Sequence, residues 1–325
     1  MLHAEIKSLP SEDISILINV ENSTRKYLCD CGEASLLSVK EAQNLSAIFI
    51  SHTHIDHFSN FDGLFRHQIG SGETIIICGP KNIQNHVASR LQSYTWNLVD
   101  DSAICYQIRE IVSPEEINVY EVRPPFWEIS APKRREGLLY TDESIEVTFT
   151  ILDHKTPSIA YLFKANDKIN FNEENVEFPK GKSMSELRNA FFQNNEEIEI
   201  IVDNTPYIAK ELFHLLKRTA GFRLGIIMDH ATISENREKI KTTFKNVDLV
   251  YIEAFYKDDE KDFAETNFHS YASASGAVMK ESQVVDAIPI HFSRRYSQED
   301  ILEIQECFDK AFGKDRNEKI VQKDE

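Results

Sequence analysis

The densest group of metal-binding side chains in the sequence is Ser51-His-Thr-His-Ile-Asp-His57. Alternate residues of an extended chain point to the same side, so His52 and His54 can bind one ion together. Asp56 and His57 follow within about one turn and can contribute to a second ion. Imidazole and carboxylate ligands favour zinc, with manganese or iron as alternatives. The spacing therefore predicts a centre that binds two metal ions, expected to be Zn²⁺ with Mn²⁺ or Fe²⁺ as the alternatives.

Further potential ligands follow short apolar segments elsewhere in the chain. Five apolar, β-branched runs have the length and composition of buried strands, and they end at or next to His52, His154, Asp229, Glu253 and His291. The carboxyl ends of strands in an α/β sheet are the usual place for ligands. We therefore expect these five strand ends to meet around the metal ions.

The pattern His-x-His-x-Asp-His, followed by isolated later ligands, resembles the metallo-β-lactamase superfamily over nearly the whole chain. Asp30-Cys-Gly-Glu33 and Cys78-Gly-Pro80 are similar to elements that flank the motif in that superfamily. The segments 152–161 and 291–296 are similar to the third and last motifs of ribonuclease Z, the tRNA 3′-processing endonuclease. Tyr94 to Val99 resembles a bacterial ribonuclease Z-like subgroup. This resemblance implies an α/β protein with an αββα sandwich, two sheets flanked by helices.

The resemblance also implies a set of ligands for each metal ion. These sets are His52, His54 and His154 for the first ion, and Asp56, His57 and His291 for the second. A bridging aspartate should complete both sets, and two residues compete for this role. Asp229 is favoured because a helix and a strand separate it from Glu253, as in the family. Asp203, in Ile-Ile-Val-Asp-Asn-Thr, is the alternative.

Two loops resemble the catalytic loops of the same family. Ile252-Glu253-Ala254 is similar to a His-Glu-Ala-Thr loop, and Phe268-His269-Ser270 is similar to a His-Ser-Thr loop. The resemblance implies that His269 protonates the leaving oxygen and that Glu253 orients His269. A ribose alkoxide needs this proton because it is a poor leaving group. Asp56 is expected to help manage the proton of an attacking hydroxide bridged by the two metals.

The expected substrate is a phosphodiester, which the resemblance identifies as precursor tRNA. Guanidinium groups match phosphate oxygens in a fork geometry, so Arg295 is expected to bind the substrate phosphate together with Ser293. Arg294 is the adjacent alternative. The resemblance further implies a homodimer. Two other functions stay open: a phosphodiesterase for small substrates such as cyclic nucleotides, and a non-catalytic metal-binding or scaffold protein.

The net charge of the chain bears on the choice between long RNA and small phosphodiesters. The 325 residues contain 36 Lys plus Arg against 53 Asp plus Glu, giving a net charge of -17. Such an excess of acid repels long polyanions unless basic groups or metal ions are concentrated locally. Metal ions would attract a phosphodiester locally. The charge therefore leaves phosphodiester hydrolysis open and makes long RNA the less certain substrate.

Composition and patterning set the remaining expectations. No apolar run approaches the roughly 18 residues that would span a bilayer, and the start of the chain lacks a secretory pattern. We expect a cytoplasmic protein, without membrane association, whose five cysteines are free thiols. The chain is expected to form a single domain over residues 1–325, with an inserted arm at 171–212 and a disordered tail at 313–325.

Three helices are expected from capping and periodicity. Thr232-Ile-Ser-Glu235 predicts a capping box that opens a helix through about Phe244. Residues 208–219 have apolar side chains on one helical face. Ser297 and Asp300 predict the cap of a C-terminal helix.

Overall fold

The computed structural model describes residues 2–172 and 181–314. The chain divides into two compact units, one comprising Met1–Lys164 with Arg223–Glu325 and the other comprising Ala165–Phe222. The larger unit confirms the predicted αββα sandwich. The expected arm at 171–212 falls within the smaller unit, and its function as an arm stays a prediction. Most of the expected tail, from residue 315 on, lies outside the described residues.

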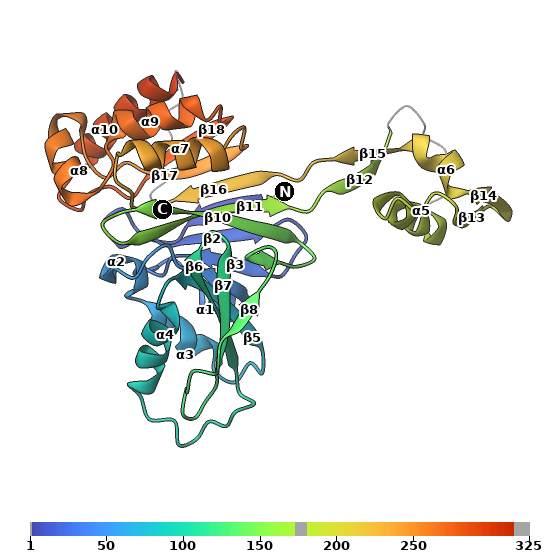
Figure 1. Cartoon of the computed structure of the whole chain (residues 1–325), viewed down its shortest axis with the longest axis horizontal. Helices are drawn as coiled ribbons and strands as arrows, with labels where there is room; N and C mark the ends of the chain where they lie inside the picture. Colours follow the sequence, from blue (N-terminus) through green and yellow to red (C-terminus); the bar gives the residue numbers. More distant parts are fainter. Residues whose placement is uncertain (1, 173–180, 315–325) are drawn as a thin grey trace. The chain divides into compact units, whose positions relative to one another are not determined.

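The first sheet of the larger unit contains eight strands in their order along the chain. They are β1 Leu2–Ile6, β2 Ile16–Val20, β3 Lys26–Cys29, β4 Leu45–Phe49, β5 Thr74–Pro80, β6 Cys105–Ser113, β7 Glu116–Val122 and β8 Lys133–Arg135. The central strands β3 to β6 run parallel. Their outer face is covered by α1 Val39–Gln43, α3 Phe61–Gln68 and α4 Ile83–Gln92 (Figure 1). A short helix, α2 Ile55–Phe58, follows β4.

The second sheet has the order β18-β17-β16-β11-β10-β9. Its strands are β9 Tyr140–Thr141, β10 Ile145–Asp153, β11 Pro157–Ala165, β16 Arg223–Ile227, β17 Leu249–Glu253 and β18 Asp286–Ile290. The helices α7 Ser234–Thr243, α9 Ala272–Glu281 and α10 Gln298–Phe312 pack against it through an apolar cluster. The turn η2 Asp258–Glu260 and helix α8 Lys261–Asn267 follow β17. Because β16, β17 and β18 are parallel, their carboxyl ends share one edge of the sheet.

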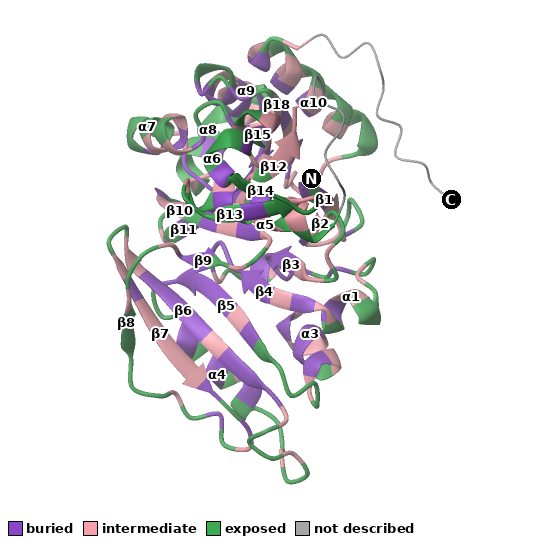
Figure 2. Ribbon diagram, turned by 90° about the vertical axis from the view of Figure 1, so that its right-hand side faces the viewer, coloured by how far each residue is buried: buried purple, intermediate pink, exposed green. Residues whose placement is uncertain are grey.

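Aromatic side chains fill the space between the two sheets. Phe49 at the end of β4 lies with its ring centre 5.3 Å from that of Tyr161 and 5.0 Å from that of Phe163, both on β11. Tyr140 on β9 lies 5.6 Å from the same ring. Figure 2 shows the strands β3 to β6 as largely buried. The inner faces therefore form one core, and this core fixes the strand ends relative to each other.

The smaller unit has an apolar cluster of its own. It contains β12 Lys168–Phe171, α5 Lys182–Phe192, β13 Glu199–Val202, β14 Thr205–Ile208, α6 Ala209–Leu212, η1 Phe213–Leu215 and β15 Leu216–Thr219. Strand β12 pairs with β15, and β13 pairs with β14. The insertion starts and ends on neighbouring strands: Ala165 N–H donates to Phe222 O at 2.9 Å, and Lys164 stands opposite Arg223.

Two of the expected helices differ from the structure. The helix predicted at 208–219 ends at Leu212, because Leu216–Thr219 instead forms strand β15, which pairs with β12. The predicted capping box at 232–235 is wrong: α7 begins at Ser234, and its cap residue, Ile233, has no side-chain hydrogen bond. The predicted cap at Ser297 is confirmed, since its hydroxyl accepts from Asp300 N–H at the start of α10.

The remaining expectations concern thiols and membranes. All five cysteines are free, as predicted, and four of them are buried. Within residues 2–172 and 181–314, no helix has the length and apolar character needed to cross a membrane.

The inter-sheet contacts of Phe49 lead to a stability prediction. We expect Phe49→Ala to lower the free energy of unfolding by about 3–5 kcal/mol, because it removes a fully buried ring and leaves a cavity. Both tryptophans, Trp96 and Trp127, lie in the larger unit, so urea unfolding followed by tryptophan fluorescence reports on that unit alone. Phe126→Ala is the matched control, since Phe126 is 74% exposed and its loss should cost no more than about 0.5 kcal/mol. Equal losses in the two variants would contradict this account of the core.

Candidate metal centre

The predicted ligands lie at or just beyond the carboxyl ends of strands from both sheets. His52 and His54 follow β4, and Asp56 and His57 lie on α2. His154 follows β10, whereas Asp229 and His291 follow β16 and β18. Glu253 is the last residue of β17. These residues form three overlapping groups of potential metal-binding atoms, each within 4.8 Å of one another, and all three groups include Asp229.

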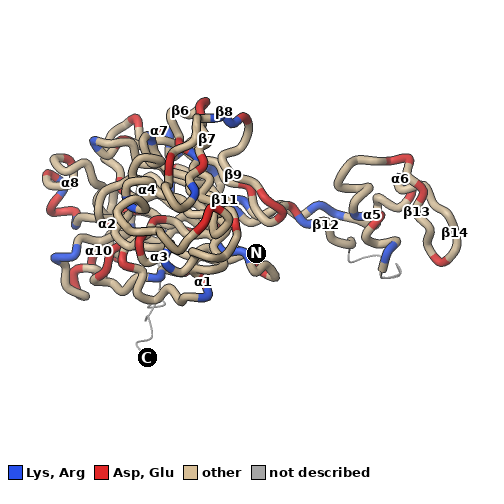
Figure 3. Tube along the Cα trace, turned by 90° about the horizontal axis from the view of Figure 1, so that it is seen from below, with Lys and Arg blue, Asp and Glu red and all other residues tan. Residues whose placement is uncertain are grey.

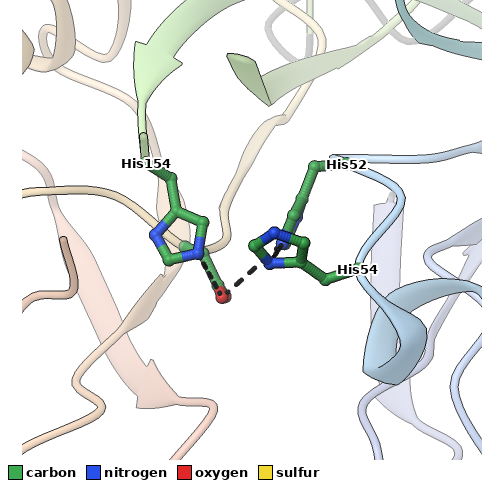
Figure 4. A group of neighbouring side chains, drawn as sticks. His52, His54 and His154 are labelled. Atoms are coloured by element: carbon green, nitrogen blue, oxygen red, sulfur yellow. Dashed lines mark hydrogen bonds and ion pairs between the residues drawn. The ribbon is translucent and has the colours of Figure 1, made fainter. Parts of the chain in front are cut away.

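The first group contains His52, His54, His154 and Asp229. Figure 4 shows the three imidazoles turned toward one another, with dashed lines marking their interactions. His52 Nε2 lies 2.9 Å from His54 Nδ1 and 3.7 Å from Asp229 Oδ2. His154 Nε2 lies 3.5 Å from the same carboxylate oxygen. Three nitrogens and one oxygen thus surround a single point, which is the donor set of a tetrahedral zinc site.

The second group contains Asp56, His57, His291 and Asp229. Asp229 Oδ1 lies 3.3 Å from His57 Nε2 and 2.9 Å from His291 Nδ1. Asp56 Oδ2 lies 3.6 Å from His57 Nε2 and 3.7 Å from His291 Nε2. Because Asp229 presents one oxygen to each group, its carboxylate can bridge two ions.

Three buried atoms of the second group lack a hydrogen bond within the described structure: His57 Nε2, Asp229 Oδ1 and His291 Nδ1. Although His291 Nδ1 lies close to Asp229 Oδ1, the angles do not form a hydrogen bond. Buried polar atoms without partners are costly, so their clustering requires explanation. A cation held between them would satisfy all three. The residues therefore fit a bound metal.

The charges of these residues also favour a cation. Burial alone would raise the pKa of Asp229, but the imidazoles of His291 and His57 outweigh burial and hold that pKa well below its usual range. Burial alone would lower the pKa of His57, but Asp229 and Asp30 outweigh it and raise that pKa to about 10. Both shifts mean that the centre stabilises positive charge beside Asp229.

The orientation of the histidines is set by groups behind them. His57 Nδ1 lies 2.7 Å from Asp30 Oδ2, and the same oxygen accepts from Ser51 Oγ at 2.7 Å. Ser51 Oγ also lies 3.1 Å from His52 Nδ1. These contacts occupy the Nδ1 atoms of His57 and His52 and direct Nε2 of each toward Asp229 and the candidate metal site. The sequence indicated Asp30 only as part of a motif; the structure adds its contact with His57.

The predicted catalytic pair lies beside the same carboxylate. His269 Nδ1 bonds to Glu253 Oε1 and lies 3.7 Å from Asp229 Oδ2. Glu253 is fully buried, and its Oε2 accepts from the backbone N–H of His230 at 3.0 Å and of Ser270 at 3.2 Å. Burial alone would lower the pKa of His269, but Glu253 raises it above its usual value. His269 can therefore hold a proton next to the metal positions.

An aromatic contact that the sequence did not indicate also holds His269. The ring of Phe255, two residues after Glu253, stacks on His269 with centres 4.1 Å apart and planes 14° apart. Phe255 directly follows Glu253-Ala254, at the position where the family's His-Glu-Ala-Thr loop has threonine. The aromatic residue at this position was the one feature of the sequence that could have indicated the contact.

Two other residues predicted for the site, Asp203 and Arg295, lie outside the groups that share Asp229. Asp203, the alternative bridging residue, is exposed in the turn between β13 and β14 of the smaller unit. Arg295 forms an ion pair with Glu260 and lies over the ring of Tyr256 at 5.2 Å. Phosphate binding by Arg295 therefore stays a prediction. A substrate phosphate would have to compete with the carboxylate of Glu260 for this guanidinium group.

The two neighbours of Arg295 are similarly engaged. Arg294 contacts Asp13 and also Glu33, the latter at 2.8 Å. The backbone N–H of Ser293 donates to Phe255 O at 3.1 Å. Arg294 thus connects the segment after β18 to the segments before β2 and after β3, so it too already has carboxylate partners.

Comparison with known proteins identifies relatives. No protein-family model matches the chain. Ribonuclease Z from Borreliella afzelii is 30% identical over 290 residues, covering 86% of this chain and 80% of that protein. Ribonuclease Z from Deinococcus radiodurans is 25% identical over 320 residues, covering 92% of each.

Solved structures share the fold. The short form of human tRNase Z has a TM-score of 0.55 and 17% identity, and the match covers 91% of this chain and 94% of that one. The metallo-β-lactamase fold protein YhfI from Bacillus subtilis has a TM-score of 0.57 and 13% identity, and the match covers 96% and 94%. These similarities show the sandwich architecture.

The contact between Asp30 and His57 leads to a prediction about metal affinity. We expect Asp30→Asn to weaken metal binding about 10–100-fold, because His57 loses the carboxylate that orients it. Competition with a chromophoric chelator measures the affinity. Asp62→Asn is the matched control, since Asp62 pairs with Arg90 on the surface of the larger unit. Unchanged affinity in Asp30→Asn would contradict an orienting role.

Proposed function

This chain belongs to the ribonuclease Z family of the metallo-β-lactamase superfamily, and we propose that it hydrolyses phosphodiester bonds in RNA with two bound zinc ions. Precursor tRNA is the proposed substrate, and its 3′ end is the proposed site of cleavage. The observation that carries the proposal is the arrangement of two donor groups that share Asp229 and lie next to the bonded pair His269 and Glu253.

In this proposal the donor groups each hold one ion. His52, His54 and His154 would hold the first, Asp56, His57 and His291 would hold the second, and Asp229 would contribute to both. Metal ions bound there would lower the pKa of a water molecule and neutralise charge that develops on the phosphate. Their charge also attracts a phosphodiester to a protein whose net charge is -17.

His269 supplies the proton that the leaving oxygen needs. Three features support this role: the bond from its Nδ1 to Glu253, its pKa raised by that carboxylate after the opposing effect of burial, and its position near Asp229. The stacked ring of Phe255 limits rotation of the imidazole. Nδ1 is occupied by Glu253, so Nε2 is the atom that donates to the substrate.

Small phosphodiesters such as cyclic nucleotides are the second candidate substrate. The smaller unit, Ala165–Phe222, favours this candidate because it has no excess of basic residues, and Figure 3 shows acidic and basic residues interspersed along its described part. The sequence of residues 165–222 contains seven basic and ten acidic side chains, namely Lys168, Lys180, Lys182, Arg188, Lys210, Lys217 and Arg218 against Asp167, Glu173, Glu174, Glu177, Glu186, Glu196, Glu197, Glu199, Asp203 and Glu211. A strongly basic arm would bind RNA more tightly.

We further propose that the protein is a homodimer, on the basis of the family resemblance, and that it acts in the cytoplasm, on the basis of its composition and its free cysteines. Light scattering coupled to size-exclusion chromatography measures the oligomeric state, and a monomeric mass would remove the dimer from the proposal.

The proposed activity leads to a prediction about which substrate is cleaved and whether cleavage requires metal. We expect the zinc-loaded protein to cleave precursor tRNA at its 3′ side, chelation to abolish cleavage and added zinc to restore it. His54→Ala should lower both metal content and cleavage, because it removes a donor from the first group. Gel analysis of end-labelled precursor tRNA, beside a panel of cyclic nucleotides, measures this. Cleavage of cyclic nucleotides alone would favour the second candidate, and no hydrolysis by metal-loaded protein would favour a non-catalytic function.

The role of His269 leads to a separate prediction. We expect His269→Ala to slow RNA cleavage about 10²–10⁴-fold, because a ribose alkoxide must be protonated as it leaves. Hydrolysis of bis(p-nitrophenyl) phosphate should fall much less, since p-nitrophenolate leaves without a proton. His86→Ala, at an exposed position on α4, is the matched control. Equal losses on the two substrates would rule out proton donation by His269.

A further inference from the structure

Lys155 is a cation that directly follows a predicted metal ligand, His154. Its backbone has a φ of 61°, and its N–H donates to Asp153 Oδ1 at 2.7 Å. The side chain is exposed, and Nζ lies 5.7 Å from the centre of the Phe268 ring. Throughout residues 2–172 and 181–314, no carboxylate forms an ion pair with Lys155. Its ammonium group is therefore available to an anion from solution.

Phe268 places this cation beside the loop of the proposed proton donor. The backbone oxygen of Phe268 lies 2.7 Å from His154 Nδ1, so this carbonyl accepts a hydrogen bond from the imidazole. The next residue, His269, has its ring centre 4.6 Å from that of His154. Lys155 is therefore next to His154 in the chain and near the Phe268 ring in space. His269 is next to Phe268 in the chain and near the His154 ring in space.

Three cations that follow the strands β17 and β18 are already paired. Arg294 contacts Asp13 and Glu33, and Arg295 contacts Glu260. Lys257 contacts two carboxylates of α10, Asp300 and Glu303. A substrate phosphate would have to displace a carboxylate from each of these groups. Lys155 requires no such displacement.

We propose that Lys155 binds a second phosphate of the substrate, one nucleotide away from the bond that is cleaved and on the side of the leaving group. This inference rests on the proposed function. The cleaved phosphate lies at the donor groups, and the nucleoside that leaves takes a proton from His269. That nucleoside therefore lies along the loop that contains Phe268 and His269. Its remaining phosphate then faces Lys155, and the Phe268 ring provides an apolar surface beside it.

The proposal defines the class of substrate. A cyclic mononucleotide has a single phosphate and cannot occupy both positions. A strand of RNA has a phosphate at every linkage and can place one at the donor groups and the next at Lys155. The arrangement of Lys155 therefore favours a chain substrate with at least one nucleotide on the leaving side, even though the protein as a whole is acidic.

The test uses zinc-loaded enzyme and an RNA substrate in which single linkages near the cleaved bond are replaced by neutral methylphosphonates. In the wild-type enzyme, the neutral linkage one nucleotide away on the leaving side should raise KM on the order of ten-fold, the size expected for one charged hydrogen bond. Lys155→Ala should raise KM on unmodified RNA by a similar factor and reduce the salt dependence of binding by about one unit of slope. Lys155→Arg should restore most of the affinity.

Lys245→Ala is the matched control, because Lys245 is exposed and follows the end of α7, away from the strand ends that form the metal centre. The decisive result is non-additivity: the neutral linkage should have little further effect in Lys155→Ala. Full effects of the same linkage in both enzymes, or an unchanged KM in Lys155→Ala, would overturn the inference while leaving the proposed function intact. A wild-type enzyme that cleaves no RNA would overturn the proposed function and this inference with it.

Discussion

One buried carboxylate, Asp229, constrains the rest of the site. It is 1% exposed, and its two oxygens face the two donor groups separately. A carboxylate removed from water is stable only with compensating positive charge, and the raised pKa of His57 reflects the same demand. Every other element of the centre is arranged around this demand. The parallel strands β16, β17 and β18 bring Asp229, Glu253 and His291 to one edge, and the inter-sheet core brings His52 and His154 to them.

In three imidazoles of the centre, hydrogen bonds hold Nδ1 and leave Nε2 open. Asp30 takes Nδ1 of His57, Glu253 takes Nδ1 of His269, and the carbonyl of Phe268 takes Nδ1 of His154. In each case Nε2 is left for a metal ion or the substrate. The bond from His154 to Phe268 also connects a proposed metal ligand directly to the loop of the proposed proton donor, so the candidate metal centre and His269 depend on the same local structure.

The sequence was informative where local pattern and chemistry coincide. Strand ends such as that before His154 combine an apolar run with a polar residue, and both signals lie within a few residues, so fold and donor groups could be predicted together. The strand at Leu216–Thr219 could not, because its pairing with β12 depends on residues about 50 positions away while its local pattern favours a helix. The carboxylate partners of Arg294 and Arg295 were missed for the same reason: Asp13 is distant in sequence, and charge alone does not show which cations are already paired.

The insertion of residues 165–222 has a consequence for folding. Its two ends are hydrogen-bonded to each other, and they continue the antiparallel pair β11 and β16. Gly221 is needed at this junction, since a side chain there would collide with the backbone oxygen of Ala165. The sandwich can therefore close this long loop by forming a hairpin-like strand pair, and loop-closure entropy grows only slowly with the number of residues enclosed. Changes in the length of the insertion should thus cost the sandwich little stability, so this segment can vary in length without loss of the fold that carries the candidate metal centre.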